Sequence, residues 1–200
     1  MKRKALAIVL ILAMLLSMGN CSINNLEALA KEITGNNVFT AMNTADALGN
    51  PGGFLLSDGV NAAKVYVDTA REEFSESDGK GYCGLEIIAR TFAGDVELVT
   101  GKAADVVTSA ADMSGNVIIA GTIGKNEVID TLISKGAIDV SGLYKDGALK
   151  WDCYQMQFVG GDVLSACGYN GVSSALVITG SNKRGAMYGL FNISEHIGVS

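Results

Sequence analysis

Histidine is almost absent from this sequence of 200 residues, which contains only one, His196. A Ser-His-Asp triad would have to be built on that residue, and nothing else in the sequence indicates one. His196 falls in the last turn of a predicted helix, where a positive charge suits the helix dipole, so we interpret it as a capping residue. The four cysteines contain no CxxC pair, which argues against a zinc site.

Positive charge and aromatic side chains are also scarce. Lys and Arg number 15 against 21 Asp and Glu, which gives a net charge of -6. A nucleic-acid partner requires a basic surface, so we expect none. Only 6% of the residues are aromatic, and Trp151 is the single tryptophan. Carbohydrate-binding modules usually stack sugars on exposed aromatic rings, so the composition disfavours a dedicated module of this kind.

The N-terminus has the features of a secretory signal peptide. In MKRKALAIVLILAMLL, three cations precede an apolar run too short to span a bilayer comfortably, so we expect export and no membrane span. The small residues of Ala28-Leu29-Ala30 favour cleavage after Ala30, and lipid attachment at Cys21 is the alternative. We therefore expect a signal peptide at residues 1–30, a linker at 31–50 and one domain at 51–200.

The pattern of apolar residues predicts strands and helices in mixed order. Apolar residues recur at three- and four-residue spacing in residues 84–100 and 125–135, as in amphipathic helices. Residues 116–122, NVIIAGT, form a continuous apolar run typical of a strand buried on both faces. The other predicted elements are strands at 53–58, 63–68, 151–159 and 163–169, and a strand followed by a helix in 174–200. About six strands and three helices predict an α/β fold with a mixed sheet.

Two cysteines fall in the strands predicted at 151–159 and 163–169, which we expect to pair antiparallel. A three-residue loop at 159–161 would place Cys153 and Cys167 opposite each other, where they can form a disulfide. A two-residue loop would place them on different faces of the sheet. The disulfide is therefore a prediction that depends on the register.

The segment GTIGK, residues 121–125, follows a predicted strand and opens a predicted helix. This geometry can present backbone N–H groups to an anion. The segment matches neither GxxxxGK[ST] nor GxGxxG. We interpret it as a structural glycine turn, and we expect no cofactor.

Carboxylates are numerous, but none is nominated as catalytic. Glu72 with Glu73, and Asp95 with Glu97, are close pairs of the kind usually found on solvated faces, and Asp68 is also expected to be solvated. Glycoside cleavage needs two carboxyls that converge across a sugar, which proximity in the sequence cannot establish.

The turn GSNKRG, residues 180–185, places two cations where a helix begins. Its short polar residues, Ser181 and Asn182, can supply the N-cap of the last helix. Lys183 and Arg184 fall in the first turn, where each exposed cation costs a few tenths to about 1 kcal/mol. The simplest interpretation is that both are solvated. The alternative is that residues 181–184 contact another domain or lie near an acidic substrate.

Three segments carry a resemblance to a known family. They are FLLSDGVNAAKVYVD, the stretch from GNVIIAGTIGK to KWDCYQMQFV, and ALVITGSNKRGAMYGLFNISEHIGVS. Together they resemble the N-terminal domain of the glycoside hydrolase family 115 α-glucuronidases, over about residues 50–200, with GSNKRGAMYG and SEHIGVS as the most specific motifs. The sequence departs from the family at Asn182, where aspartate is more frequent, and in a longer connection, GGDVLSACGYNGVSS.

The resemblance implies a function for the whole enzyme and not for this domain alone. Family members are secreted enzymes that remove glucuronic acid, or its 4-O-methyl ether, from xylan, and their catalytic carboxylates lie in a (β/α)8 barrel that follows the N-terminal domain. It therefore implies a truncated, non-catalytic domain, with the catalytic residues beyond Ser200. The implied partners are the C-terminal barrel and, through the full-length enzyme, glucuronoxylan. Two alternatives stay open: a free-standing secreted carbohydrate-binding or interaction module, and a homo-oligomer.

Overall fold

The computed structural model describes residues 53–72 and 83–199, which are built around a five-stranded sheet of order β2-β1-β3-β7-β6. Four strands run parallel: β1 (Lys64–Tyr66), β2 (Val106–Val107), β3 (Gly115–Thr122) and β7 (Val172–Gly180). The edge strand β6 (Tyr154–Gly160) runs antiparallel to β7. The sheet is therefore mixed, as predicted. The expected signal peptide and linker lie outside the described residues.

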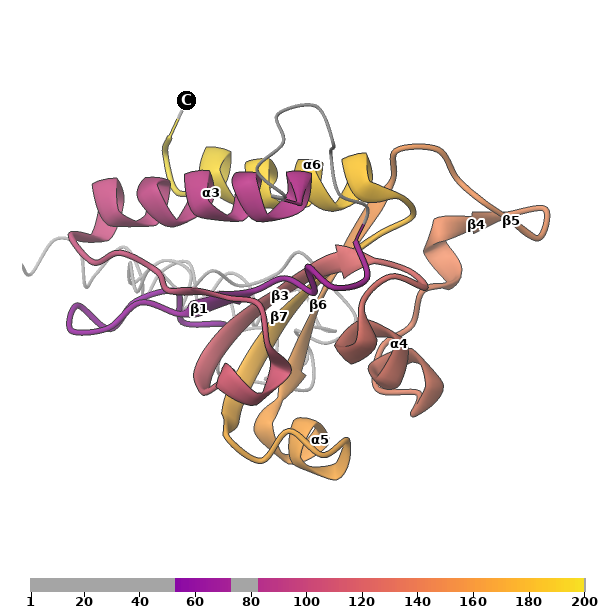
Figure 1. Cartoon of the computed structure of the whole chain (residues 1–200), viewed down its shortest axis with the longest axis horizontal. Helices are drawn as coiled ribbons and strands as arrows, with labels where there is room; N and C mark the ends of the chain where they lie inside the picture. The colour runs from indigo at the N-terminus through magenta and orange to yellow at the C-terminus, as the bar shows by residue number, and fades with distance from the viewer. Residues whose placement is uncertain (1–52, 73–82, 200) are drawn as a thin grey trace, which may run out of the picture. The chain divides into compact units, whose positions relative to one another are not determined.

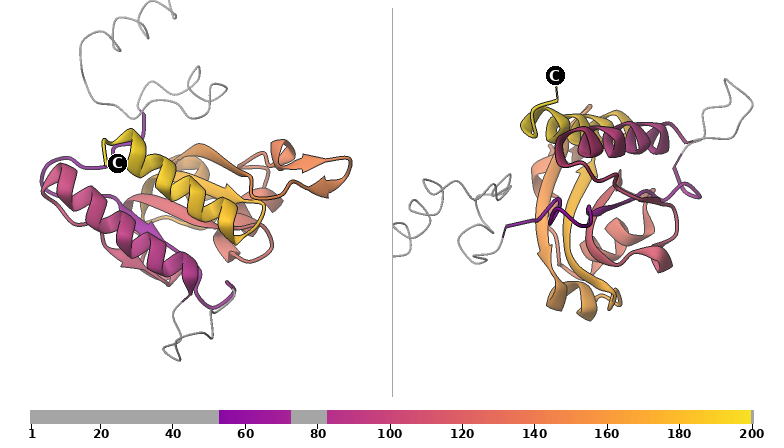
Figure 2. Two further views of the ribbon diagram at one scale, coloured as in Figure 1. Left: turned by 90° about the horizontal axis from the view of Figure 1, so that it is seen from above. Right: turned by 90° about the vertical axis from the view of Figure 1, so that its left-hand side faces the viewer.

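Helices cover both faces of the sheet, which makes a three-layer α/β fold. The longest two, α3 (Gly84–Thr100) and α6 (Lys183–His196), lie side by side on one face (Figures 1 and 2). The shorter α4 (Glu127–Ser134) and α5 (Gly161–Ala166) pack on the opposite face. In the described part of the chain, no helix has the length and apolar content needed to cross a membrane.

Each face of the sheet has its own hydrophobic core, because side chains along a strand alternate between the two faces. The core under α3 and α6 includes Ile118 and Ile178, whereas Ile119 and Val177 point to the core under α4 and α5. Burial on both faces explains the continuous apolar run in β3. In the last helix, Ala186, Leu190 and Ile193 form a buried stripe, whereas Phe191 is exposed.

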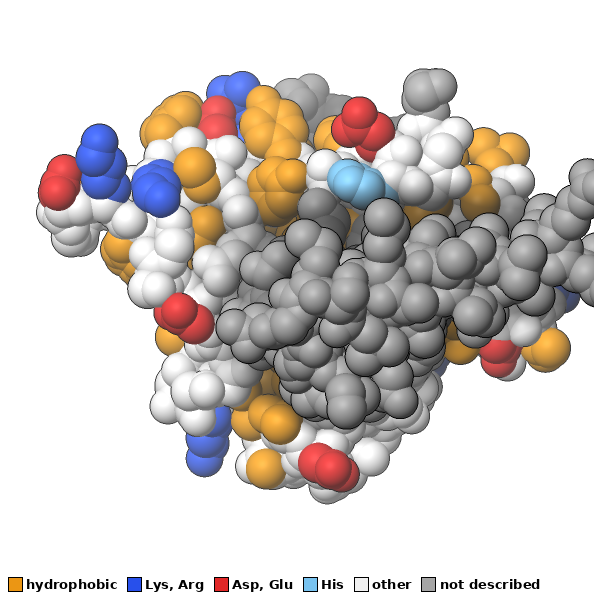
Figure 3. Space-filling model, turned by 180° about the vertical axis from the view of Figure 1, so that it is seen from behind, with side chains coloured by type: hydrophobic (Ala, Val, Ile, Leu, Met, Phe, Trp, Pro, Cys, Tyr) orange, Lys and Arg blue, Asp and Glu red, His pale blue; other side chains and the backbone are white. Residues whose placement is uncertain are grey.

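A short hairpin extends beyond the sheet between α4 and β6. It consists of β4 (Tyr144–Lys145) and β5 (Ala148–Leu149), preceded by a 3-10 helix, Ser141–Leu143. A second 3-10 helix, Ala110–Asp112, precedes β3. Figure 3 shows the molecule from behind, with charged side chains on the hairpin at the left and hydrophobic side chains over the helical layer at the top.

The strand predicted at 163–169 is wrong: the chain turns from β6 directly into α5. Val163 is exposed and Leu164 is buried, as one helical face requires. The partner of β6 is instead β7, with Tyr154 opposite Gly180. The predicted disulfide is therefore also wrong. Cys153 precedes β6 and Cys167 follows α5 at the other end of that strand, about 20 Å away by the rise of a strand, and both thiols are free.

The strand predicted at 53–58 is reduced to isolated bridge residues, Phe54 and Ser57, of which Ser57 pairs antiparallel with Ala62. A tight turn joins Ser57 to Ala62. Its N–H groups are satisfied by the Asp58 carboxylate, which accepts from Val60 at 2.7 Å and from Asn61 at 2.6 Å. The regular sheet begins only at β1.

Candidate functional site

The candidate site lies at the edge of the sheet where β1, β3 and β7 end. Because these strands are parallel, the segments that follow them meet there: residues 68–72, 122–126 and 181–184. In the sheet, β2 lies on the outer side of β1, whereas β7 and β6 lie on the outer side of β3. The chain therefore extends in opposite directions across the sheet after β1 and after β3. In open α/β sheets, ligand sites form at such points, outside the carboxyl ends of the strands.

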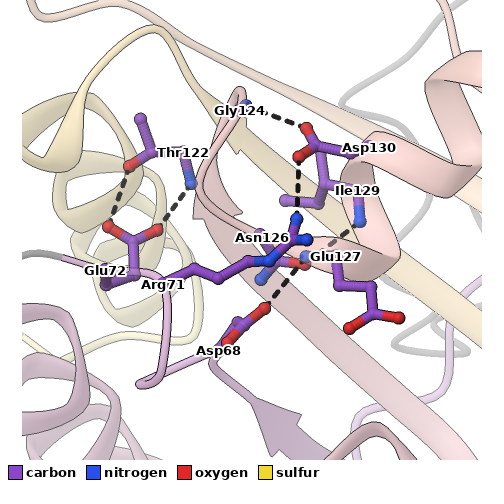
Figure 4. Close-up of polar contacts among 9 residues, drawn as sticks. All are labelled: Asp68, Arg71, Glu72, Thr122, Gly124, Asn126, Glu127, Ile129 and Asp130. Atoms are coloured by element: carbon purple, nitrogen blue, oxygen red, sulfur yellow. Dashed lines mark hydrogen bonds and ion pairs between the residues drawn. The ribbon is translucent and has the colours of Figure 1, made fainter.

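Glu72 ties the segment after β1 to the end of β3 (Figure 4). One carboxylate oxygen, Oε1, accepts the backbone N–H of Thr122 at 2.9 Å, and Oε2 accepts the Thr122 hydroxyl at 3.2 Å. Only 2% of Glu72 is exposed. Burial raises the pKa of this carboxyl, and the two bonds from Thr122 oppose that rise. Glu72 is therefore a structural acceptor and not one member of a solvated pair; Glu73 lies outside the described residues.

Asp68 and Asn126 fix the start of α4 (Figure 4). The Asp68 carboxylate accepts the backbone N–H of Glu127 at 3.0 Å. Asn126 caps the helix by accepting the N–H of Ile129 at 3.0 Å, and its amide donates to the Ala120 carbonyl at 3.3 Å. Both side chains are buried, so the expectation that Asp68 is solvated is wrong. Its partner lies 59 residues away in the sequence, which local pattern cannot reveal.

The GTIGK turn uses its N–H groups within the chain. Gly124, with φ of 77°, donates its N–H to Asp130 Oδ1 at 2.8 Å. The other oxygen of Asp130 pairs with Arg71 at 3.5 Å. The Thr122 backbone N–H donates to Glu72, and the Lys125 backbone N–H donates to the Thr122 carbonyl at 3.0 Å. These N–H groups therefore do not face an external anion. The geometry supports the interpretation of a structural turn.

The turn after β7 is held against the start of β6 by Ser181 and Cys153. The Ser181 N–H donates to the Cys153 carbonyl at 2.9 Å, and the Cys153 N–H donates to the Ser181 hydroxyl at 3.0 Å. Asn182 is the N-cap of α6, as predicted, and accepts the Gly185 N–H at 2.9 Å. A side chain at Gly185 would meet the Cys153 carbonyl oxygen at 2.1 Å, so only glycine permits this approach.

Asp152 connects this turn to the chain beside the single tryptophan. It accepts the Asn182 side-chain amide at 2.8 Å and pairs with Arg184 at 3.3 Å. Arg184 also donates to the Tyr188 hydroxyl at 2.9 Å and lies 5.8 Å from the centre of that ring. Neighbouring Trp151 is 79% exposed.

A pocket of about 360 Å³ opens at this edge. All four residues predicted as an interface or substrate-proximal group line it: Ser181, Asn182, Lys183 and Arg184. The rest of the wall, none of it predicted from the sequence to belong to this site, comes from Glu72, Thr122, Ile123, Lys125 and Trp151. The isolated tryptophan was a usable signal for the site, but the buried glutamate was not.

The other sequence candidates do not form a catalytic centre in the described residues. Asp95 accepts the Ser194 hydroxyl at 2.6 Å and thereby joins α3 to α6. His196 Nδ1 contacts the Asn192 carbonyl at 2.7 Å in the last turn of α6. Over residues 53–72 and 83–199, no group of three His, Cys, Asp or Glu side chains is placed to hold a metal ion.

No protein-family model and no curated protein matches the chain. Among solved structures, it is similar to one described as a family GH115 4-O-methyl-α-glucuronidase with specificity for decorated arabinogalactans. The sequence identity is 22% and the TM-score is 0.46. The match covers 73% of this chain and 14% of that chain, so this chain corresponds to a small part of the solved protein's length.

Proposed function

We propose that this chain is the non-catalytic N-terminal domain of a secreted α-glucuronidase, a glycoside hydrolase that removes (4-O-methyl)glucuronic acid side chains from xylan. Residues 1–30 would direct export, with cleavage near Ala30. The whole enzyme would carry its catalytic carboxylates in a following barrel domain, and this domain would present the edge described above to the barrel or to the substrate.

The observation that carries the proposal is the position of the most specific motif. GSNKRGAMYG, the segment that most resembles the family, forms the turn after β7 and the start of α6. Four of its residues, 181–184, line the pocket. A motif that served only to end a domain would have no reason to bring two cations to an open pocket.

The bonding of the carboxylates supports a non-catalytic role. Glycosidases need two carboxyl groups about 5 to 9.5 Å apart that can both reach the substrate. Glu72 is the acidic side chain that lines the pocket, and its oxygens are both engaged with Thr122. Asp68 is bound to the start of α4. The nearby Asp152 carboxylate is likewise engaged, with Asn182 and Arg184.

One observation favours a second candidate, a free-standing secreted carbohydrate-binding module. Trp151 is largely exposed beside the pocket, in the manner of a sugar-stacking ring. This function needs no barrel domain. Both candidate functions predict that the chain binds sugar, but only the enzyme domain predicts catalysis by a longer protein.

The test compares the 200-residue chain with the protein encoded by its complete reading frame. Both are incubated with glucuronoxylan, and released 4-O-methylglucuronic acid is measured. We expect release by a longer protein that carries a barrel domain and none by the 200-residue chain. Release by the short chain would disprove the non-catalytic role. A reading frame that stops after Ser200 would disprove the multidomain enzyme and favour the module.

A further inference from the structure

The pocket at the carboxyl edge is positively charged in a protein of net charge -6. Its wall contains three cations, Lys125, Lys183 and Arg184, against one carboxylate, Glu72. Glu72 is buried behind its bonds to Thr122. Two of these three cations, Lys183 and Arg184, lie in the first turn of α6, where the helix dipole disfavours positive charge. Excess positive charge held in this position fits an anionic ligand.

One pocket lysine has no charged partner among the described residues. Arg184 shares its charge with Asp152, at 3.3 Å. Among the residues that the structure describes, by contrast, the Lys183 ammonium has no hydrogen-bonding or ion-pair partner, although its side chain is half-buried. A half-buried ammonium gains more from a bound carboxylate than a fully solvated one, because less water screens the pair.

Trp151 adds an apolar surface at the mouth of the same pocket. It is 79% exposed, whereas most large hydrophobic side chains of the sheet are buried. Its backbone is anchored two residues later, where Cys153 and Ser181 exchange hydrogen bonds at 2.9 to 3.0 Å. The indole is thus carried on a fixed segment beside the cations. Indole rings provide the apolar platform on which sugar rings stack, and the polar side chains of Ser181 and Asn182 lie in the same wall.

We propose that this pocket binds the uronic acid residue of a saccharide, with its carboxylate at Lys183 and Arg184 and its ring against Trp151. The proposal rests on the proposed function for the choice of a saccharide over other anions. A phosphate group is the rival ligand. Phosphate sites in α/β folds use free backbone N–H groups of glycine turns, and here Gly124 and Thr122 donate theirs to Asp130 and Glu72.

The single tryptophan makes the test specific to the site, because the tryptophan fluorescence of the purified chain comes from Trp151. The chain is titrated with methyl glucuronide, methyl glucoside and inorganic phosphate. We expect methyl glucuronide to bind about tenfold more tightly than methyl glucoside, since only the glucuronide carboxylate can form charge-assisted hydrogen bonds with the two cations. That preference should shrink as the salt concentration rises.

Variants identify the residues responsible. Lys183→Ala should weaken glucuronide binding about tenfold without changing glucoside binding, since it removes the charge and leaves the platform. Lys102→Ala is the matched control. Lys102 is exposed and lies just beyond the C-terminal end of α3, and this variant should bind as the wild type does. Trp151→Ala, followed by calorimetry, should lose both sugars. Circular dichroism shows whether each variant is folded.

Equal affinity for the two glycosides, tighter binding of phosphate, or no response to either glycoside would overturn the proposal. These outcomes can be told apart from a failure of the proposed function. If a longer protein releases glucuronic acid while this chain binds none, the pocket assignment fails alone. If this chain binds glucuronide but the protein encoded by the complete reading frame has no activity, only the enzyme assignment fails.

Discussion

Two neighbouring strands of this sheet end in the same way and serve different purposes. After β3 and after β7, the chain makes a short glycine-containing turn, an asparagine caps the next helix, and the helices pack on opposite faces of the sheet. In the β3 turn, the carboxylates of Asp68, Glu72 and Asp130 occupy backbone N–H groups. In the β7 turn, two cations line an open pocket.

The difference teaches that a strand–turn–helix unit is not by itself an anion site. Both turns have the geometry that can offer N–H groups to an anion. In the β3 turn this capacity is used to tie β1, β3 and α4 together. The β7 turn is tied instead through Ser181 and Asp152, and within the described residues the Lys183 ammonium takes no part in that bonding.

The largest effect is expected where the β7 turn meets β6. A methyl group at Gly185 would lie 2.1 Å from the Cys153 carbonyl oxygen, a backbone atom that cannot rotate away. Gly185→Ala should therefore lower the free energy of unfolding by about 3 kcal/mol. Gly94, in α3, has no heavy atom within 4 Å, and Gly94→Ala should raise it by up to about 1 kcal/mol. Urea unfolding measures both; a neutral Gly185→Ala would contradict the close contact.

The two caps should differ in strength. Asn126 is fully buried and makes two hydrogen bonds, so Asn126→Ala leaves the Ile129 N–H and the Ala120 carbonyl without partners and should cost about 2–3 kcal/mol. Asn182 is half-buried, where water can replace it, and Asn182→Ala should cost about 1 kcal/mol. Thermal unfolding of the pair gives the difference, and a larger loss at Asn182 would reverse the comparison.

The buried carboxylate of the β3 turn should make stability depend on pH. Burial raises the pKa of Glu72 above 4.5 in the folded protein, so the folded state holds this proton more tightly than the unfolded state. Its contribution to the free energy of unfolding is therefore complete below about pH 4.5 and is lost as the pH rises through the folded-state pKa.

The measurement is the difference in free energy of unfolding between the wild type and Glu72→Gln, followed from about pH 4 to pH 7. We expect this difference to shift against the wild type as the pH rises. Glu97→Gln, on the exposed side of α3, is the control for removing a carboxylate from the surface. If the difference stays constant or moves in favour of the wild type, burial does not control this carboxyl.

The smallest effect on stability is expected at the cations of the β7 turn. Arg184 pairs with Asp152 at the surface, where solvent screens the pair. Replacing Lys183 or Arg184 with alanine should therefore leave the free energy of unfolding close to that of the wild type. Chemical denaturation tests this. A loss of several kcal/mol would mean that these cations hold the fold together and are not reserved for a ligand.

Local signals predicted much of the secondary structure. The three- and four-residue spacing in 84–100 and the following Gly101, with φ of 72°, match α3 and its left-handed cap. The apolar run at 116–122 matches β3, and Asn182 caps α6 as predicted. Each of these features depends on neighbours within a few residues, which the sequence displays directly.

The wrong predictions for residues 163–169, for the disulfide and for Asp68 share one cause, which is contact between distant segments. Residues 161–166 are apolar enough for a strand or a helix, and packing on β7 decides for α5. A side chain at Gly161 would also lie 2.6 Å from the Ser173 carbonyl oxygen, so that packing needs glycine there. Because β6 pairs with β7 and not with a strand at 163–169, Cys153 and Cys167 do not lie opposite each other, and the predicted disulfide does not form.

The candidate site also combines features that are local in the sequence with features that depend on distant contacts. The sequence by itself determined that residues 181–184 form a polar turn with two cations at a helix start, because capping and dipole effects are local. Only the tertiary structure decided that Trp151 and Glu72 join that turn in one pocket. It also decided that the carboxylates after β1 close the neighbouring turn. Parallel strands gather their carboxyl ends at one edge regardless of distance along the chain, so a site built there has no contiguous trace in the sequence.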